Sequence, residues 1–322
     1  MKLKKGFDLK LVGKAPLELI QAASATTFAI KPTDFPGIQR PKVLVNEGDT
    51  VKAGTPILLD KAMDQVIYAS PVSGEVVEIK RGDKRKLLEI KILADATVSH
   101  EKSGALDLSQ DRAAIADKLA ASGVWPNLIQ RPFGIVANPA DTPKAIFVSG
   151  YASAPLAADF NYVLAGKEKE LQAAITALSK LTSGSVHVSV GKNDNSPFAG
   201  LDNISLHKVS GPHPIGNVGT QIAKIDPVNK GEVVWTINPQ DLVIIGELLL
   251  TGKFNAERII ALAGSSVAAP KYYKTIIGAS IASLVEGKLK GDNNRIISGN
   301  VLTGRTKSLK GSFGFYDTMI TV

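Results

Sequence analysis

Short apolar stretches alternate with turns rich in glycine, proline and asparagine between residues 41 and 93. Three of these stretches predict strands, at residues 43–45, 57–59 and 75–79. The residues between them, such as Asn46–Asp49 and Ser70–Gly74, are of the types that favour turns. Evenly spaced short strands with this punctuation are typical of a small β-sandwich or barrel.

From about residue 100 the pattern changes to alternating helices and strands. Helices are predicted where apolar residues recur every three or four positions, at residues 111–122, 168–181 and 241–251. Strands are predicted at residues 145–148, 185–190 and 204–209. Alternation at this spacing predicts an α/β sheet layered with helices. His187 lies within the second strand, so we expect a structural histidine there rather than a ligand.

The last part of the chain has a different order of elements. Strands are predicted at residues 258–264 and 271–277, followed by a short helix at 280–285 and a third strand at 295–297. With 322 residues, the whole chain is too long for one ordinary core, so two or three domains are expected.

Composition excludes several kinds of site. The chain has no cysteine, which rules out disulfides, thiolate-ligated iron–sulfur clusters and a cysteine nucleophile. Its four histidines show no metal-ligand spacing. No apolar stretch is long enough to cross a bilayer, and the basic N-terminus is not followed by the apolar region of a signal peptide, so we expect neither a transmembrane segment nor a signal peptide.

The net charge of +8 is concentrated in part at Lys80–Lys86, where five of seven residues are basic. We expect this run to be a solvated hairpin tip between two strands. The alternatives are contacts with acidic lipid headgroups, a nucleic acid or an acidic partner. Nucleic-acid binding is not expected, because aromatic residues make up only 6% of the chain and no nucleic-acid motif is present.

One glycine-rich stretch could contact a ligand. Gly211, Gly216 and Gly219 follow the strand predicted at 204–209, and His213 lies among them. Their spacing matches neither the dinucleotide motif nor the P-loop, and two prolines remove donors that a phosphate would need. We interpret the stretch as a conformationally demanding loop, or alternatively as a ligand or partner contact centred on His213. No catalytic motif is recognisable, so no catalytic or metal-binding residue is assigned.

Two local patterns resemble known modules. Val45–Gly54 and Ser70–Val76 are similar to the biotinyl/lipoyl carrier family, whose prosthetic group is attached to a lysine at a hairpin tip. Asp60-Lys61-Ala62 resembles that tip, but the hairpin looks too long, so we expect Lys61 to be unmodified. The strand, strand, helix, strand order after residue 255 resembles the soluble-ligand-binding β-grasp family.

An ordered series of stretches resembles the NqrA family, the A-type subunits of Na⁺-translocating NADH:quinone reductases. The series covers essentially the whole chain: Lys4–Leu9, Arg81–Arg85, Gly123–Trp125, Arg131–Phe133, Ile146–Val148, Pro155–Asp159, Ser210–Thr220, Trp235, Gln240–Asp241, Arg258–Gly264 and Asn294–Gly299. Family members extend further at the C-terminus, so we expect a truncated chain or an unusually short member. A more distant similarity is to the NADH-binding flavoprotein subunit of complex I and the C subunit of the Rnf complex. The glycine-rich flavin loop of the complex I relative has no match here.

The resemblance implies a fold, a location and a set of partners. We expect an α/β multidomain protein with an N-terminal segment and a biotinyl/lipoyl-like β-sandwich at residues 1–98, a Rossmann-like α/β domain at 99–254 and a β-grasp domain at 255–322. The chain would be a peripheral subunit on the cytoplasmic face of the bacterial inner membrane, bound to the other subunits of the reductase. It would support ubiquinone reduction coupled to Na⁺ export, with ubiquinone as a possible ligand, no cofactor of its own, and flavins and iron–sulfur centres on its partners. The main alternative is an NADH- or flavin-binding dehydrogenase component of an Rnf- or complex I-like assembly. A lipoyl or biotinyl carrier and a basic membrane-surface protein are the remaining alternatives.

Overall fold

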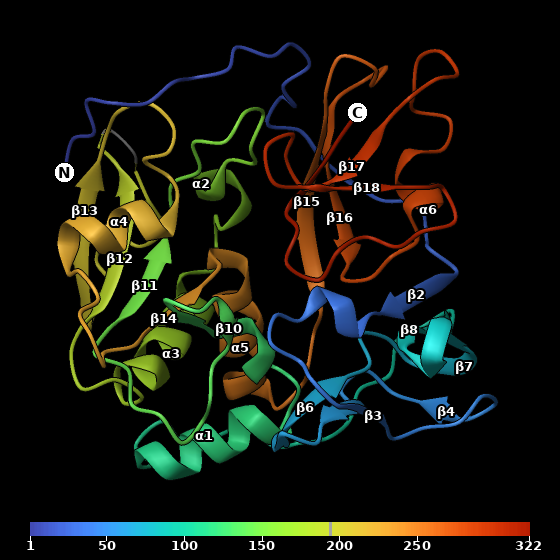
Figure 1. Cartoon of the computed structure of the whole chain (residues 1–322), viewed down its shortest axis with the longest axis horizontal. Helices are drawn as coiled ribbons and strands as arrows, with labels where there is room; N and C mark the ends of the chain where they lie inside the picture. The colour runs from blue at the N-terminus through green and yellow to red at the C-terminus, as the bar shows by residue number, and fades with distance from the viewer. Residues whose placement is uncertain (193–194) are drawn as a thin grey trace.

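The computed structural model describes residues 1–192 and 195–322. Four sheets and six α-helices of these residues are arranged in three regions: an N-terminal β-domain, a middle α/β domain and a C-terminal domain (Figure 1). The N-terminus lies beside the middle domain, and the C-terminus lies within the C-terminal domain.

The N-terminal β-domain consists of two small sheets. Their strand orders are β2-β8-β7-β4 and β3-β5-β6. The strands and 3₁₀ helices are β2 (Thr27–Ile30), η1 (Pro32–Asp34), β3 (Pro41–Val43), β4 (Thr50–Val51), β5 (Pro56–Asp60), β6 (Met63–Ala69), β7 (Gly74–Arg81), η2 (Asp83–Arg85) and β8 (Leu87–Ala94). Alternate residues such as Val66, Val76 and Ile90 are fully buried between the sheets, as the short-strand pattern predicts. The predicted strand at 43–45 is shifted, since β3 ends at Val43.

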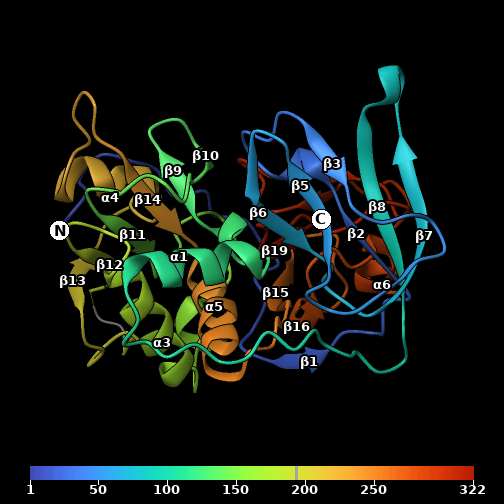
Figure 2. The same ribbon diagram turned by 90° about the horizontal axis from the view of Figure 1, so that it is seen from below.

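The basic run Lys80–Lys86 is the tip of a long hairpin. β7 and β8 project from the body of the molecule, and η2 closes the hairpin between them (Figure 2). Lys84 and Arg85 have positive φ angles of 52° and 60°, and both side chains are exposed. The prediction of a solvated hairpin tip therefore describes this run correctly.

The middle domain is built on a six-stranded sheet in the order β10-β9-β14-β11-β12-β13. Its elements are α1 (Arg112–Ala121), η3 (Trp125–Asn127), β9 (Ile129–Arg131), β10 (Ile135–Val136), β11 (Ile146–Ser149), α2 (Phe160–Val163), α3 (Glu168–Ser179), β12 (Val186–Gly191), β13 (Ile204–Val209), α4 (Val218–Ile225), β14 (Val234–Ile237) and α5 (Pro239–Thr251). The four strands β14, β11, β12 and β13 are parallel, whereas β9 and β10 extend the sheet in antiparallel fashion.

Helices cover both faces of this sheet, as the packing of alternate residues of β11 shows. Successive side chains of a strand point to opposite faces. Ile146 and Val148 belong to the main core together with residues of α3 and α5, while Phe147 belongs to a separate cluster with Ile222 of α4. A strand covered on both sides is expected to be apolar throughout, as the run at 145–148 is.

The C-terminal domain contains a mixed sheet in the order β1-β16-β15-β19-β17-β18. Its elements are β15 (Glu257–Ala263), β16 (Lys271–Ile276), α6 (Ile281–Val285), β17 (Ile296–Ser298), β18 (Arg305–Lys307) and β19 (Met319–Thr321). The edge strand β1 (Leu19–Gln21) comes from the other end of the chain and pairs in parallel with β16. The first 21 residues, which precede the strands of the β-domain, lie against the middle and C-terminal domains.

Helix α1 joins the middle domain to the β-domain. It packs along β6 at the junction of the two domains (Figure 2). Gly123 follows the helix with φ +77°, and a Cβ atom on it would lie 2.3 Å from the Cβ of Ala69. Glycine is therefore needed both to end the helix and to allow this approach.

Candidate functional site

A large cavity lies in the middle domain at the point where the strand order of the sheet reverses, between β11 and β14. From β11 the chain passes through α2 and α3 to β12 on one side, whereas β14 on the other side is reached through α4. Open α/β sheets bind ligands at the carboxyl ends of the strands that flank such a switch point. The cavity has a volume of about 780 Å³, and it is lined by Ser149 at the end of β11, Tyr151 after that strand, Thr236 in β14 and Asn238 after β14. Its volume is within the range of about 300–1,000 Å³ typical of small-molecule sites. We call it the switch-point cavity.

The predicted glycine loop forms one wall of the switch-point cavity. Gly216 and Gly219 are among the lining residues, with Asn217 between them as the N-cap of α4. The backbone N–H of Gly216 donates to Ser153 Oγ at 2.8 Å, and its carbonyl oxygen lies 2.8 Å from Ser149 Oγ. The loop is thus held against the chain that follows β11.

The three glycines of the loop have different roles. A Cβ atom on Gly211, which has φ +129°, would lie 2.2 Å from the carbonyl oxygen of Leu3. A Cβ atom on Gly216 would lie 2.5 Å from the backbone nitrogen of Ser153. A Cβ atom on Gly219 would meet nothing within 4 Å. Close backbone approach therefore explains the first two glycines, while the third leaves space open at the cavity wall.

His213 is occupied by contacts within the chain. Its Nδ1 lies 3.0 Å from Ser153 Oγ, and its backbone N–H donates to Asp8 Oδ1 at 2.8 Å. Its carbonyl oxygen accepts from the backbone N–H of Phe7 at 2.9 Å. Ser153, not the imidazole, reaches the cavity wall, so His213 connects the cavity loop to the beginning of the chain.

Two buried acceptors at the cavity lack a hydrogen-bond partner within the described chain. Asn127 is 2% exposed and Asp241 is fully buried, and both line the cavity. Asn127 Oδ1 and Asp241 Oδ2 have no partner, and neither does Nε of the lining residue Arg131. A buried polar group without a hydrogen bond is costly, so these atoms favour a ligand or water that donates to the first two and accepts from the third.

Asp241 is also one half of a buried ion pair. It lies in the first turn of α5, and its Oδ1 accepts from Nη2 of Arg258 in β15. Arg258 is 1% exposed, and its Nε and Nη1 have no partner in the described part of the chain. Burial raises the pKa of Asp241, against the attraction of Arg258. The pair joins the middle domain to the C-terminal domain directly behind the cavity.

The C-terminal domain supplies the cavity rim through Thr303 and Tyr316. The Tyr316 hydroxyl donates to the carbonyl oxygen of Pro126 at 2.6 Å, next to Asn127. Burial raises the pKa of Tyr316 well above its ordinary value, so this hydroxyl stays protonated and remains a donor.

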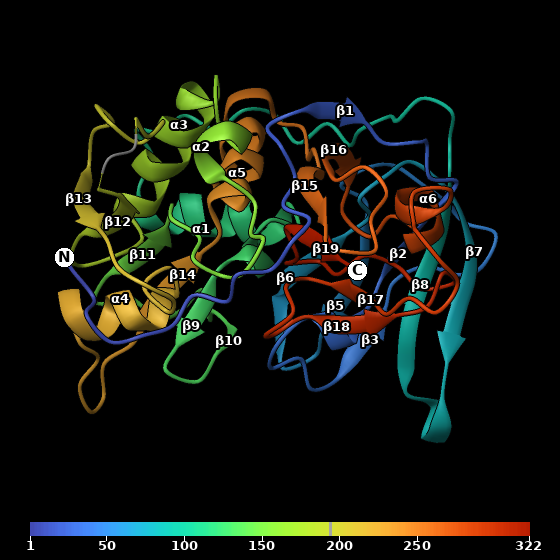
Figure 3. The same ribbon diagram turned by 90° about the horizontal axis from the view of Figure 1, so that it is seen from above.

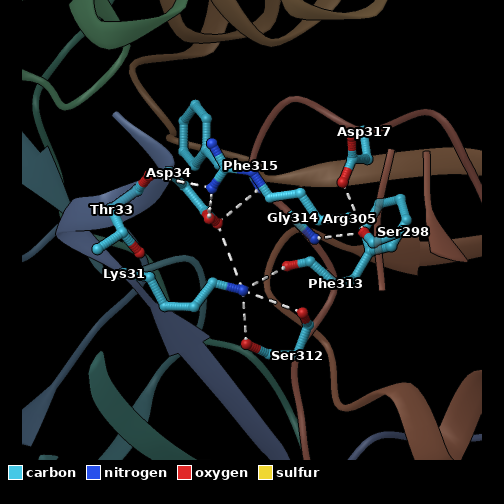
Figure 4. A network of polar contacts seen from close by, with 10 residues as sticks. All are labelled: Lys31, Thr33, Asp34, Ser298, Arg305, Ser312, Phe313, Gly314, Phe315 and Asp317. Atoms are coloured by element: carbon cyan, nitrogen blue, oxygen red, sulfur yellow. Dashed lines mark hydrogen bonds and ion pairs between the residues drawn. The ribbon is translucent and has the colours of Figure 1, made fainter. Parts of the chain in front are cut away.

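A polar network anchors the loop that carries Tyr316 (Figure 4). Lys31, next to η1, donates to Ser312 Oγ at 2.8 Å and pairs with Asp34 at 3.3 Å. Asp34 in turn accepts from the backbone N–H of Phe315 at 3.2 Å. Burial lowers the pKa of Lys31 and Asp34 opposes that shift, so the ion pair offsets part of the cost of burying the ammonium group. The network ties the β-domain to the cavity rim.

Lys61 lies at the tight turn between β5 and β6, and its side chain is exposed. The neighbouring Asp60 accepts from the backbone N–H groups of Gln39, Arg40 and Ala62 at 2.8, 3.0 and 3.0 Å. Burial of Asp60 opposes its ionisation, but these three donors outweigh it and lower the pKa. Asp60 thus fixes the turn. Together with Ala62 it also lines a second cavity of about 440 Å³.

The histidines do not form a metal site in the described residues. No group of three or more His, Cys, Asp or Glu in residues 1–192 and 195–322 is placed to hold a metal ion. His187 Nδ1 and His207 Nε2 lie 3.0 Å apart on neighbouring strands, a pairing that could not be foreseen without the strand register. His100 Nδ1 lies 2.9 Å from the carbonyl oxygen of Phe254.

Family models match the chain in three consecutive parts. Residues 1–95 match the NqrA N-terminal barrel-sandwich hybrid domain, residues 110–254 the NqrA second alpha/beta domain, and residues 259–308 the NQRA C-terminal domain. These matches confirm the predicted α/β multidomain fold with a β-domain at its N-terminus.

Curated relatives extend the match to almost the whole chain. The chain is 39% identical over 308 residues to the A-type subunit of the Na(+)-translocating NADH-quinone reductase from Marinomonas sp. (strain MWYL1), and the match covers 94% of this chain and 68% of the relative. It is 34% identical over 328 residues to the protein of the same name from Neisseria meningitidis serogroup B, with 100% of this chain and 73% of the relative covered.

A solved structure, the NAD+-reducing [NiFe]-hydrogenase in the air-oxidized state, aligns with 70% of this chain and 52% of its own at 12% identity. Its TM-score of 0.43 is too low to support an inference. The three family models and the curated relatives, by contrast, agree along the chain. The chain belongs to the NqrA family of Na⁺-translocating NADH-quinone reductase subunits.

Proposed function

We propose that this chain is a peripheral subunit of a Na⁺-translocating NADH:quinone reductase, located on the cytoplasmic face of a bacterial inner membrane. The observation that carries the proposal is its 39% identity, over 94% of the chain, to a relative named as part of that enzyme. None of the helices in residues 1–192 and 195–322 has the length and apolar character needed to cross a bilayer. The chain would attach to the other subunits of the complex, which hold the flavins and iron–sulfur centres.

We further propose that the switch-point cavity receives the quinone headgroup. The chemistry of its wall supports this, because a quinone offers two carbonyl acceptors and a quinol offers two hydroxyl donors. The unpartnered Arg131 Nε can donate to a carbonyl, while Asn127 Oδ1 and Asp241 Oδ2 can accept from hydroxyls. No redox step is assigned to side chains of this subunit.

The role of the subunit is tested in membranes. Removing the chain from an organism that carries the complex should abolish Na⁺-stimulated NADH:quinone reductase activity, and restoring it should recover that activity. Full activity and Na⁺ transport without the chain would refute the role. The purified chain should be colourless, since flavin absorbance would favour the alternative of a flavin-binding dehydrogenase component.

Quinone binding is tested on the purified chain by tryptophan fluorescence. The two tryptophans of the chain, Trp125 and Trp235, are fully buried, with ring centroids 5.4 Å apart. Trp125 begins the 3₁₀ helix that ends at Asn127, and Trp235 precedes the lining residue Thr236. A short-chain ubiquinone should therefore quench their fluorescence in a saturable manner.

Gly219 offers a test that preserves the fold. Leucine at this position would extend into open space at the cavity wall, so Gly219→Leu should weaken quinone binding by at least ~10-fold, the equivalent of about 1.4 kcal/mol. Ala223→Leu, on the exposed side of the same helix, should leave binding unchanged. If Gly219→Leu binds quinone as the original chain does, this cavity is excluded as the quinone site. If the original chain binds no quinone, its role in the complex is that of a scaffold.

A further inference from the structure

The first 20 residues form an extended segment on the surface of the molecule. We call residues 1–20 the N-terminal segment. It starts beside β13 and crosses the upper edge of the middle domain (Figure 1). It ends in β1, which pairs with β16 of the C-terminal domain. From above, it runs as a strip along the middle domain to the boundary with the C-terminal domain and then follows that boundary to β1 (Figure 3).

Backbone contacts hold this segment in place at both ends and in the middle. The backbone N–H of Leu3 donates to the carbonyl oxygen of Ser210, and that of Gly264 donates to the carbonyl oxygen of Gly13, at 2.9 and 2.8 Å. Leu19 is the first residue of the strand that pairs with β16. Gly13 passes so close to Gly264 that a Cβ atom on it would lie 2.2 Å from the carbonyl oxygen of Gly264. The segment is therefore part of the folded structure.

Although the backbone is fixed, many apolar side chains of the segment face solvent. Phe7 is 74% exposed, Val12 72% and Leu17 55%. Leu9 and Leu11 are 42% and 43% exposed. Single exposed apolar residues are common on protein surfaces, but a run of them along one pinned segment marks an interaction site.

Lysines are interspersed with these apolar residues. The segment contains Lys2, Lys4, Lys5, Lys10 and Lys14, and all five side chains are exposed. None of the salt bridges found within residues 1–192 and 195–322 involves them.

The two acidic residues of the segment are already engaged. Asp8 accepts from the backbone N–H of His213, and Glu18 pairs with Lys271 at 2.9 Å. In the described structure, neither carboxylate is paired with a lysine of the segment, so the positive charge of the strip is available to a partner.

We propose that the N-terminal segment is a docking surface for an anionic lipid bilayer. Exposed apolar side chains next to lysines suit the membrane interface, where the apolar groups enter the headgroup region and the ammonium groups bind anionic headgroups. A protein partner fits less well, because the cores of protein interfaces are depleted of lysine. The fixed backbone presents these side chains without a large ordering cost on binding.

This inference rests on the proposed peripheral location, and it adds the face of the chain that meets the membrane and the class of lipid. Lipid binding is measured without quinone, and quinone binding without lipid. A negative result for lipid binding therefore leaves the proposed quinone site standing, and a negative result for quinone binding leaves the proposed membrane surface standing.

The test uses the purified chain and vesicles of phosphatidylcholine with or without about one-third phosphatidylglycerol. The chain should float with the anionic vesicles and not with the neutral ones, and added salt should weaken binding. Since each lysine near an anionic surface contributes about fivefold in partition, the triple variant Lys4→Gln/Lys5→Gln/Lys10→Gln should lose on the order of 100-fold. Phe7→Ser/Val12→Ser should also weaken binding, because it removes the inserted apolar groups.

The β7–β8 hairpin tip provides the matched control. The variant Lys84→Gln/Arg85→Gln/Lys86→Gln removes the same charge from a part of the molecule away from the segment, and it should retain most of the binding (Figure 1). An equal loss in both triple variants would show non-specific attraction and overturn the proposal.

A fluorescent reporter adds a local readout. Emission of Phe7→Trp should shift to the blue on adding anionic vesicles, whereas that of Lys84→Trp should not. No shift at position 7 would overturn the proposal. The proposal would also be overturned if a variant of the N-terminal segment kept its lipid binding but no longer assembled with the membrane subunits. That result would show that the segment binds a protein partner.

Discussion

The buried pair Asp241–Arg258 gives a strong prediction for stability. Arg258 is 1% exposed, and its ionic contact in the described structure is to Asp241 Oδ1. Asp241→Ala would leave a fully buried guanidinium group without a carboxylate, with Nε and Nη1 already lacking partners in the described chain. Removing one member of a buried ion pair costs about 3–5 kcal/mol. For a chain of this length, that loss corresponds to a fall in Tm of about 4–7 °C.

A double-mutant cycle separates the pair from its surroundings. Replacing both residues by apolar ones of similar length, as in Asp241→Leu/Arg258→Met, removes both charges. The double variant should differ from the original chain by no more than about 1 kcal/mol in its free energy of unfolding. The cycle compares the original chain, Asp241→Leu, Arg258→Met and the double variant. Urea unfolding of these four proteins should give a coupling energy between the two residues of about 3 kcal/mol or more. Asp241→Asn is the conservative control, since it keeps the shape and loses the charge.

Either of two results would show that Asp241 and Arg258 do not form a dry, mutually dependent pair. A loss below about 1 kcal/mol in Asp241→Ala would mean that water or a rearrangement solvates Arg258, so the site is not dry. Additive losses in the double variant would mean that the two side chains stabilise the fold independently. In either case, Asp241 could not be regarded as a carboxylate fixed in the cavity wall by Arg258.

Three further predictions use the glycine loop, the histidine pair and the hairpin lysine. Gly216→Ala should destabilise the chain by about 1–3 kcal/mol, because its Cβ would meet the backbone of Ser153 in the loop after β11. Gly219→Ala should instead stabilise helix α4 by about 0.5–1 kcal/mol, and thermal unfolding distinguishes the two variants. Burial lowers the pKa of His187 and His207 from 6.5, helped by their mutual repulsion at His187 and by the N-terminal amine at His207. As the pH falls, the unfolded state therefore binds protons before the folded state does. The free energy of unfolding should be highest above pH 6.5 and should decrease as the pH drops below it. Replacing both histidines by glutamine should flatten this pH dependence in urea titrations. Lys61 should be unmodified, and an intact mass increased by a lipoyl or biotinyl group would contradict this.

Most of the regular elements could be predicted from the sequence, because local patterns determine them. The amphipathic stripe at 168–181 corresponds to α3, and the Gly252 stop corresponds to the end of α5, where that glycine has φ +72°. Other elements depend on distant residues. The three residues of β1 are all exposed and show no buried-face pattern, so nothing nearby indicates that β1 pairs with β16.

The candidate site was only partly predictable for the same reason. The glycine loop was identified from its composition, and the structure places Gly216 and Gly219 at the switch-point cavity. Asn127 and Asp241, in contrast, are 114 positions apart, and their unpartnered oxygens become visible only in three dimensions. The one local signal was Asn238-Pro239 directly after the largely apolar run at 233–237, which marks the start of a helix at the carboxyl end of a strand.

The pairing of β1 with β16 also affects the order in which the chain is completed. Gln21 lies opposite Lys274 in the sheet, a separation of 253 residues. At a synthesis rate of about 5–20 residues per second, the first strand leaves the ribosome roughly ten seconds to a minute before its partner exists. During that interval the apolar and basic start of the chain is free to meet chaperones or a nearby bilayer. The last sheet therefore gains its edge strand only after residues 271–276 have been synthesised.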